Sequence, residues 1–357
     1  MMRILVVTDA WRPQVNGVVQ TYERLAEAAA AKGAQLIFLT PAHFKTVPCP
    51  TYPSIRLALP NVSTCARFIE ATRPDAIHIA TEGPVGWMAR RYCRRRGIAF
   101  TTSFHTRFPE YLSSRFFIPE AWTHAVLRRF HNAGAGIMAA TDTLAIDLKQ
   151  RGYQRVMPWT RGVDTNVFRP QPVRRFGDEP VFLYVGRVAI EKNIGAFLAL
   201  DLPGKKVVVG DGPALASLQQ EYPDAVFTGQ QRGEALAECY ASADVFVFPS
   251  RTDTFGIVLL EAMASGLPIA AYPVMGPADV VKRGVSGVLD EDLGVAARQA
   301  LTLDRANARQ EALTFSWDHA AALFLANIER ALKPSRPKRH PAPQRSAPVL
   351  PKRLDET

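Results

Sequence analysis

The pattern of hydrophobic positions divides the chain into two series of short apolar runs, which are separated by stretches with helical spacing. In the first series, the apolar runs predict strands at residues 3–7, 35–39, 75–79, 99–102 and 136–139, and the intervening stretches predict helices at 18–31, 84–96, 119–132 and 143–151. Strands that alternate with helices indicate a parallel doubly wound sheet, whose ligand sites lie at the carboxyl ends of its strands.

A second series of the same kind begins after a link rich in Pro and Arg. It predicts strands at residues 180–186, 206–209, 225–227, 245–248 and 268–271, followed by helices at 295–303, 307–315 and 318–332. We therefore expect an α/β protein with two facing Rossmann-like, doubly wound parallel-sheet domains and a ligand cleft between them. The expected boundaries are 1–168 and 181–315 for the domains, 169–180 for the linker, and 334–357 for a disordered basic tail.

Length and composition narrow the class of protein. A chain of 357 residues that is 47% hydrophobic can bury two cores of ordinary size. No apolar run approaches the length that crosses a bilayer, and the first run is short and interrupted at Asp9, so we expect a cytoplasmic protein. The four cysteines show no paired spacing, which argues against a disulfide framework or a zinc site.

The net charge of +10 is unevenly distributed. Residues 1–178 carry 24 Lys and Arg against 12 Asp and Glu, residues 179–333 carry 13 against 19, and residues 334–357 carry 6 against 2. A basic first half and tail suit an anionic membrane surface, so we expect peripheral binding at the inner face of the cell membrane. The alternative is that the charges serve only solubility.

Two carboxylates, Asp253 and Glu261, stand eight positions apart around the start of a predicted helix. The strand at 245–248 ends just before them, and helical spacing covers 256–265, so that Asp253 lies in a strand-to-helix loop. Glu261 then lies farther along the helix, near enough to accept hydrogen bonds from ribose hydroxyls. The alternative is an ordinary strand-to-helix junction with two solvated acids.

The same loop offers backbone donors. We expect the N–H groups of Thr254, Phe255 and Gly256 to face the cleft from a helix N-terminus, where an anionic diphosphate is favoured. Arg187 and Lys192 follow the strand at 180–186 and supply two cations at its carboxyl end. Either cation alone fits an exposed loop, but their occurrence with the acidic pair favours a diphosphate site.

The first domain carries two further candidates. Gly17 closes a loop ahead of the helix at 18–31 and permits close approach of a phosphate, and Asn16 beside it offers polar contacts to donor or acceptor. His105 follows the strand at 99–102 and so lies at a carboxyl end. The other histidines of this domain lack such a context and are interpreted as structural.

These motifs, with the sequences at 162–168 and 209–213, resemble the retaining glycosyltransferases of the two-domain GT-B type in family 4, also called group 1, over most of residues 3–330. The family's acidic pair is separated by seven residues, as here, but its first acid is usually Glu rather than Asp. The resemblance implies that a final helix at 316–333 crosses back to the first domain.

The resemblance also implies roles for the site residues. Arg187 and Lys192 hold the donor diphosphate, His105 contacts the transferred sugar, and Gly210 and Arg232 lie near the nucleotide base. No carboxylate stands out as a nucleophile, and we expect neither metal nor cofactor. The predicted catalytic residues are His105, Arg187, Lys192 and Asp253, and the predicted donor-binding residues are Gly17, Arg187, Lys192, Gly210, Arg232, Thr254, Phe255, Gly256 and Glu261.

The acceptor is predicted from two segments that interleave arginines with aromatic residues, 87–96 and 115–122. Such segments can rest on anionic lipid headgroups. The alternative is that each helix buries an apolar stripe and leaves its arginines in solvent. The candidate acceptor or membrane residues are Asn16, Trp87, Arg90, Arg91, Arg94, Arg95, Phe116, Phe117 and Trp122.

The sequence therefore predicts an enzyme that moves a hexosyl unit from UDP-glucose, UDP-glucuronate or UDP-galactose to a membrane lipid such as diacylglycerol. GDP-mannose-dependent α-mannosyltransferases share the patterns at 13–18 and 104–109 and are the main alternative. A nucleotide-sugar epimerase on the same fold is a more distant one. A nucleic-acid binder would show steep salt dependence and no sugar-nucleotide binding, and the paired cations and acids argue against it.

Overall fold

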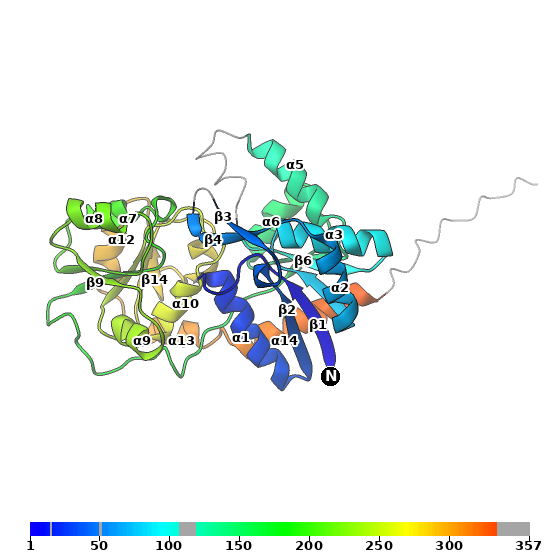
Figure 1. Ribbon diagram of the computed structural model, residues 1–357. Coiled ribbons are helices and arrows are strands. Elements are labelled where there is room, and N and C mark those ends of the chain that lie inside the picture. Colours follow the sequence, from blue (N-terminus) through cyan, green and yellow to red (C-terminus); the bar gives the residue numbers. More distant parts are fainter. Residues whose placement is uncertain (15, 50–51, 107–118, 334–357) are drawn as a thin grey trace, which may run out of the picture.

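The computed structural model describes residues 1–14, 16–49, 52–106 and 119–333. It shows two α/β domains side by side, each built on a six-stranded parallel sheet (Figure 1). The fold class predicted from the sequence is thereby confirmed.

The first sheet has the strand order β2-β1-β5-β6-β7-β8. Strand β1 is apolar from Ile4 to Val7 because both of its faces are covered: Ile4 and Val6 pack toward one layer of helices, and Leu5 and Val7 toward the other. The strands are β1 (Met2–Val7), β2 (Ala34–Leu39), β5 (Ala76–Ile79), β6 (Phe100–Phe104), β7 (Gly136–Ala139) and β8 (Val156–Pro158), and the helices are α1 (Gly17–Ala31), α2 (Val62–Thr72), α3 (Pro84–Arg96), α5 (Glu120–His131) and α6 (Asp142–Gln150).

The sequence pattern missed several short elements of this domain. They are η1 (Pro41–His43), the antiparallel pair β3 (Thr46–Cys49) and β4 (Tyr52–Ala58), helix α2 and strand β8. Helix α2 does carry apolar residues at helical spacing, namely Val62, Cys65, Ala66 and Ile69, whereas β8 is only three residues long.

The second sheet has the order β11-β10-β9-β12-β13-β14. Its first strand, β9, lies at the centre between β10 and β12, and ligands of such sheets bind beyond the carboxyl ends of the strands at this switch point. The strands are β9 (Val181–Val185), β10 (Lys205–Val209), β11 (Val226–Gly229), β12 (Val245–Phe248), β13 (Ile269–Ala271) and β14 (Gly287–Leu289), and the helices are η2 (Ile190–Lys192), α7 (Ile194–Leu198), α8 (Leu215–Glu221), α9 (Gly233–Ala241), α10 (Ile257–Ala264), α11 (Pro277–Val280), α12 (Leu293–Ala300) and α13 (Arg305–Ala312).

The last described helix, α14 (Trp317–Leu332), belongs to the second half of the chain but packs on the first domain beside α1 and across β5, β6 and β7. The indole of Trp159 donates to the carbonyl of Ala320 at 3.1 Å, and the amide of Asn327 donates to the carbonyl of Pro158 at 2.7 Å. At the crossing, a Cβ on Gly162 would lie 2.3 Å from the nitrogen of Trp317, so only glycine permits this approach.

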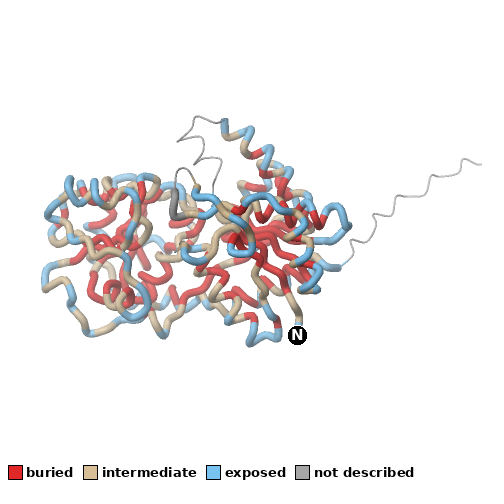
Figure 2. The backbone as a smooth tube through the Cα atoms, viewed as in Figure 1, coloured by how far each residue is buried: buried red, intermediate tan, exposed pale blue. Residues whose placement is uncertain are grey.

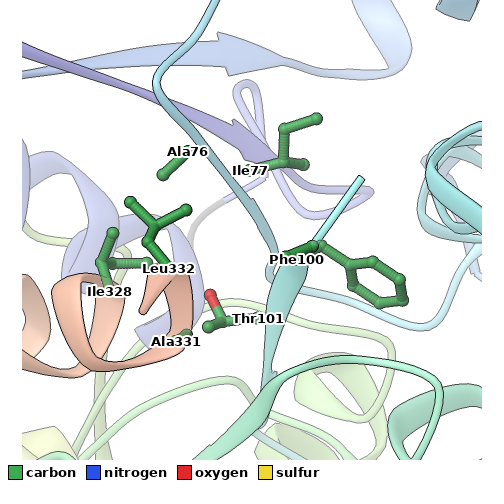
Figure 3. A pocket seen from close by; sticks show the side chains of 8 residues that line it. Ala76, Ile77, Phe100, Thr101, Ile328, Ala331 and Leu332 are labelled. Carbon is green, nitrogen blue, oxygen red and sulfur yellow. The ribbon is translucent and has the colours of Figure 1, made fainter. Parts of the chain in front are cut away.

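Buried residues follow the strands of both sheets (Figure 2). Behind the first sheet, β5, β6 and the end of α14 enclose a cavity of about 10 Å³, lined by Ile77, Phe100, Ile328 and their neighbours, which has room for about one water molecule (Figure 3). A sugar could not enter it. None of the helices in the described part of the chain is long and apolar enough to cross a membrane.

Candidate functional site

Lys192 and Asp253 form an ion pair at the carboxyl ends of β9 and β12. The ammonium donates to Asp253 Oδ1 at 2.6 Å, and each side chain is about a quarter exposed. Burial raises the pKa of Asp253, but the Lys192 ammonium and a hydrogen bond from Ser250 together lower it by more, so the net shift is downward and the carboxylate is ionised at neutral pH. The second oxygen, Oδ2, is buried and has no hydrogen-bond partner among the described residues.

The loop that carries Asp253 leads directly into α10. Gly256, the residue before the helix, has φ +81°, a left-handed conformation that favours glycine. The side chain of Phe255 turns into the core against Phe315, so only its backbone faces outward. The predicted strand-to-helix loop is present, and α10 begins at Ile257.

The first domain meets this loop at His105. Thr254 donates its hydroxyl to the carbonyl oxygen of His105 at 2.7 Å, a hydrogen bond between the two domains. Nearby, a Cβ on Gly17 would lie 3.9 Å from Cγ2 of Ile257, so the N-termini of α1 and α10 face each other. We call this region, formed by Gly17, His105, Lys192, Asp253 and Thr254, the inter-domain site.

The ring of His105 is part of a polar network that the sequence did not reveal. Its Nε2 lies 3.0 Å from the Tyr22 hydroxyl, and its Nδ1 accepts a hydrogen bond from Arg161 at 3.1 Å. The Tyr22 hydroxyl also lies 2.9 Å from Nε2 of His78, a histidine that the sequence analysis treated as structural. Arg161 follows β8 at the carboxyl edge of the sheet, and this position is the signal that could have identified it.

Glu261 lies on α10 and is more deeply buried than we expect for a residue that contacts a ribose. It is 6% exposed, and its Oε2 accepts a hydrogen bond from the Tyr240 hydroxyl at 2.8 Å. Burial raises the pKa of Glu261 from 4.5 to about 7, although the Tyr240 hydroxyl opposes this shift. Whether it contacts a ribose stays a prediction.

The remaining predicted donor residues lie around β9 and β10. The carbonyl of Arg187 accepts a hydrogen bond from the Tyr184 hydroxyl. Gly210 follows β10 directly, and a Cβ there would lie 1.8 Å from the carbonyl oxygen of Gly186, so a side chain is excluded. Arg232 precedes α9, is exposed and donates to Gln230. Nothing in these contacts identifies the base.

The expectation for Arg90 as a membrane residue is wrong. Arg90 is 5% exposed, and its guanidinium donates to the carbonyls of Arg129 and Phe130 at the end of α5. The arginine therefore joins α3 to α5. The side chain of Asn16 is likewise occupied, because its oxygen accepts from the N–H groups of Val18 and Val19 and caps α1.

The other arginines of α3 are exposed. Arg91, Arg94 and Arg95 form no hydrogen bond or ion pair within the described part of the chain. Together with Trp87 and the start of α2 they line an open groove of about 570 Å³. Trp122 on α5 is 72% exposed, whereas Phe116 and Phe117 lie outside the described residues.

Among the residues that the structure describes, no cluster of three or more His, Cys, Asp or Glu side chains could hold a metal ion. The inter-domain site instead brings together an ion pair, two helix N-termini and a network of hydroxyl and imidazole groups. Positive charge at the strand ends suits an anionic ligand, and hydroxyl and imidazole groups suit a neutral polyol.

Two family models match the chain: Glycosyltransferase Family 4 at residues 15–167 and Glycosyl transferases group 1 at residues 179–303. A GDP-mannose-dependent alpha-mannosyltransferase of Mycobacterium tuberculosis is 32% identical, and the alignment covers 81% of this chain and 83% of the relative. The sulfoquinovosyl transferase SQD2 of Arabidopsis thaliana is 31% identical over 68% of this chain and 51% of its own. An alpha-monoglucosyldiacylglycerol synthase of Streptococcus pneumoniae is 26% identical over 76% and 71%.

Solved structures agree on the fold. Sucrose-phosphate synthase from Thermosynechococcus elongatus superposes with a TM-score of 0.73 at 22% identity, over 93% of this chain and 99% of that one. Anabaena HepE, solved with UDP and glucose, superposes with a TM-score of 0.72 at 16% identity, over 92% and 100%. The chain therefore belongs to the family 4, group 1 glycosyltransferases, and its two domains form the GT-B fold.

Proposed function

We propose that this glycosyltransferase moves a hexosyl unit from a nucleotide sugar to a membrane lipid, with retention of the anomeric configuration and without a metal ion. The observation that carries the proposal is the state of Asp253. One of its oxygens is held by Lys192, and the other is buried without a partner among the described residues, beside a loop that bonds to His105 of the facing domain. A buried acceptor atom of this kind suits a hydroxyl of the transferred sugar.

Catalysis in this proposal depends on stabilising the departing diphosphate. Arg187 and Lys192 supply positive charge at the end of β9, and the N-termini of α1 and α10 add oriented N–H groups. As the bond between the sugar and the diphosphate breaks, the acceptor oxygen bonds to the anomeric carbon on the same face. The acceptor proton passes to the diphosphate oxygen that leaves, so no protein base is required.

The first candidate donors are UDP-glucose, UDP-glucuronate and UDP-galactose. GDP-mannose is the second, and a specific observation favours it: relatives named GDP-mannose-dependent alpha-mannosyltransferases from three bacteria are 30% to 32% identical over 81% of this chain. Identity at this level leaves the base-binding loop around Gly210 and Arg232 free to differ, so the donor has to be measured.

A lipid acceptor is supported by the surface of the first domain. Arg91, Arg94 and Arg95 project from α3 without acidic partners in the described chain, and Trp122 is largely exposed on the neighbouring helix α5. Exposed arginines attract anionic headgroups, and an exposed indole favours the interfacial region of a bilayer. One relative is named as an alpha-monoglucosyldiacylglycerol synthase. We propose peripheral binding at the inner face of the cell membrane, with diacylglycerol as the first acceptor to test.

The experiment is a transfer assay with anionic vesicles that contain diacylglycerol. The purified protein is incubated separately with labelled UDP-glucose, UDP-glucuronate, UDP-galactose and GDP-mannose, and label is counted in the lipid extract. Label from a UDP-sugar supports the first candidate, and label from GDP-mannose alone supports the second. Absence of lipid label with every donor, in a preparation that hydrolyses or binds a donor, would contradict the lipid acceptor.

The site assignment is tested in the same assay. Glu261→Ala is expected to abolish transfer and Asp253→Ala to weaken it strongly, while both variants keep the circular dichroism spectrum of the parent. Asp201→Ala, at an acid on the far side of the second sheet, serves as the matched control. Normal transfer by Glu261→Ala would show that this acid does not act in donor binding.

A further inference from the structure

Both ring nitrogens and the backbone carbonyl of His105 have a protein partner. Arg161 donates to Nδ1 at 3.1 Å, the Tyr22 hydroxyl lies 3.0 Å from Nε2, and the Thr254 hydroxyl donates to the carbonyl oxygen at 2.7 Å. Both ring nitrogens are therefore occupied although the residue is only partly buried, and the carbonyl is bonded to the facing domain.

The partner at Nδ1 determines where the ring proton is. A guanidinium can only donate, so Nδ1 of His105 must present its lone pair to Arg161. A neutral imidazole carries one proton, which must then be on Nε2 and point at the oxygen of Tyr22. The proton of the Tyr22 hydroxyl is directed to Nε2 of His78 at 2.9 Å or to Ser103 Oγ at 3.3 Å.

Arg161 is an unusual partner because its charge is buried without a counter-charge among the described residues. It is 5% exposed, and its other bonds go to the carbonyls of Trp159 and Thr160. Its guanidinium also lies 4.1 Å from the centre of the Trp159 ring. It forms no ion pair with any described residue. A buried cation without an ion pair is unfavourable for stability, so its place here fits a role in positioning its neighbours.

Among the residues that the structure describes, no acid faces the ring and favours a second proton. Tyr22 faces it from α1, His78 from β5 and Arg161 from the segment after β8, while His131 on α5 is paired with Glu82. Burial, and then the charge of Arg161, holds the pKa of His105 well below its usual range. Burial also lowers the pKa of His78 to about 3, so neither histidine is charged at neutral pH.

We propose that Arg161 is a positioning residue that fixes His105 as the neutral imidazole with its proton on Nε2, so that His105 neither accepts nor gives a proton during transfer. The Tyr22 hydroxyl accepts a hydrogen bond from that N–H, and the chain of hydrogen bonds continues from Tyr22 to His78 in the core. Only the role of the fixed tautomer in catalysis rests on the proposed glycosyl transfer. The fixed tautomer is a property of the resting protein and can be measured without turnover.

The first test is 15N NMR of the histidine ring nitrogens in the full-length protein. We expect His105 to show one pyridine-like Nδ1 signal and one pyrrole-like Nε2 signal, unchanged from about pH 5.5 to about pH 8, where an ordinary histidine titrates. Loss of both signals in His105→Gln assigns them. Two pyrrole-like signals in this range, or the proton on Nδ1, would overturn the proposal.

The second test replaces the guanidinium. In Arg161→Met the two His105 signals should move toward a tautomer average and titrate within that range, and the rate of transfer should fall about tenfold with a new inflection in its pH profile. Arg161→Lys keeps a cationic donor and should restore the fixed tautomer. Arg90→Met is the matched control, because Arg90 is equally buried but donates only to carbonyls.

These variants distinguish failure of the role of Arg161 from failure of the proposed function. Unchanged His105 signals in a folded Arg161→Met protein would refute the role of Arg161. Should that variant fail to fold, the parent spectrum and Arg161→Lys still decide the tautomer. A negative lipid-transfer assay combined with the expected spectra would refute the proposed function and leave the fixed tautomer standing.

Discussion

The two sides of the inter-domain site use charge in opposite ways. On the second domain, Lys192 and Asp253 form an ion pair in which both side chains remain about a quarter exposed. On the first domain, Arg161 is sealed beside His105 and meets no carboxylate in the described chain. A partly hydrated pair can exchange partners when an anionic ligand arrives, whereas a sealed cation acts on its neighbours permanently. The exchangeable pair of the second domain thus suits an anionic diphosphate, whereas the sealed cation of the first domain suits a fixed role beside His105.

The largest effect is expected where the exchangeable charge is removed. Lys192→Ala leaves the carboxylate of Asp253 without its cation and the departing diphosphate without one of its neutralising groups, so transfer should fall by about 10²- to 10³-fold. Initial rates in the lipid-transfer assay measure the loss.

The control for that variant is Lys32→Ala. Lys32 also forms an ion pair, at 2.7 Å with Asp318, but Asp318 is largely exposed and the pair lies away from the site. Surface pairs of this kind contribute about 0–1 kcal/mol to stability, so turnover should be unchanged. Equal losses in both variants would mean that Lys192 acts only on the fold.

The second prediction concerns the buried acid of the second domain. Because the pKa of Glu261 is raised from 4.5 to about 7, the folded protein keeps a proton that the unfolded chain loses, and stability falls as the pH rises through this window. Glu261→Gln removes that penalty. Its free energy of unfolding relative to the parent should improve by up to about 3 kcal/mol between acid and mildly alkaline pH.

Denaturant unfolding at a series of pH values checks this prediction. Glu329→Gln, at an exposed position of α14, is the control and should track the parent. A difference between Glu261→Gln and the parent that does not vary with pH would show that Glu261 is ionised in the folded protein.

The comparison also shows what the sequence could and could not predict. Lys192, Asp253 and His105 were identifiable because each follows an apolar run, and the carboxyl ends of parallel strands converge. Tyr22 and Arg161 were missed because their contact with His105 joins three distant segments, and neither local spacing nor composition encodes such a contact. Arg90 was misassigned for a similar reason, since its carbonyl partners lie on α5.

The third prediction extends the comparison to the outer face of the first domain. Replacement of Arg91, Arg94 and Arg95 by Gln should weaken binding to anionic vesicles by up to about 10²-fold at low salt, because each cation near a charged surface contributes about 1 kcal/mol. Vesicle sedimentation measures the change. The same change at Lys282, Arg283 and Arg298 of the second domain removes equal charge and should have little effect. Similar losses in both triple variants would mean that net charge alone, and not this surface, determines vesicle binding.

The smallest effect should come from the hydrogen bond that joins the two sides. Thr254→Val keeps the shape of the side chain but leaves the carbonyl of His105 without its partner across the interface, a loss of about 1 kcal/mol. The domains should separate more readily, which small-angle X-ray scattering would report as a larger radius of gyration. Thr252→Val, two residues away and exposed, is the matched control. If both variants scatter like the parent, the packing of α14 on the first domain, rather than this hydrogen bond, sets the distance between the two domains.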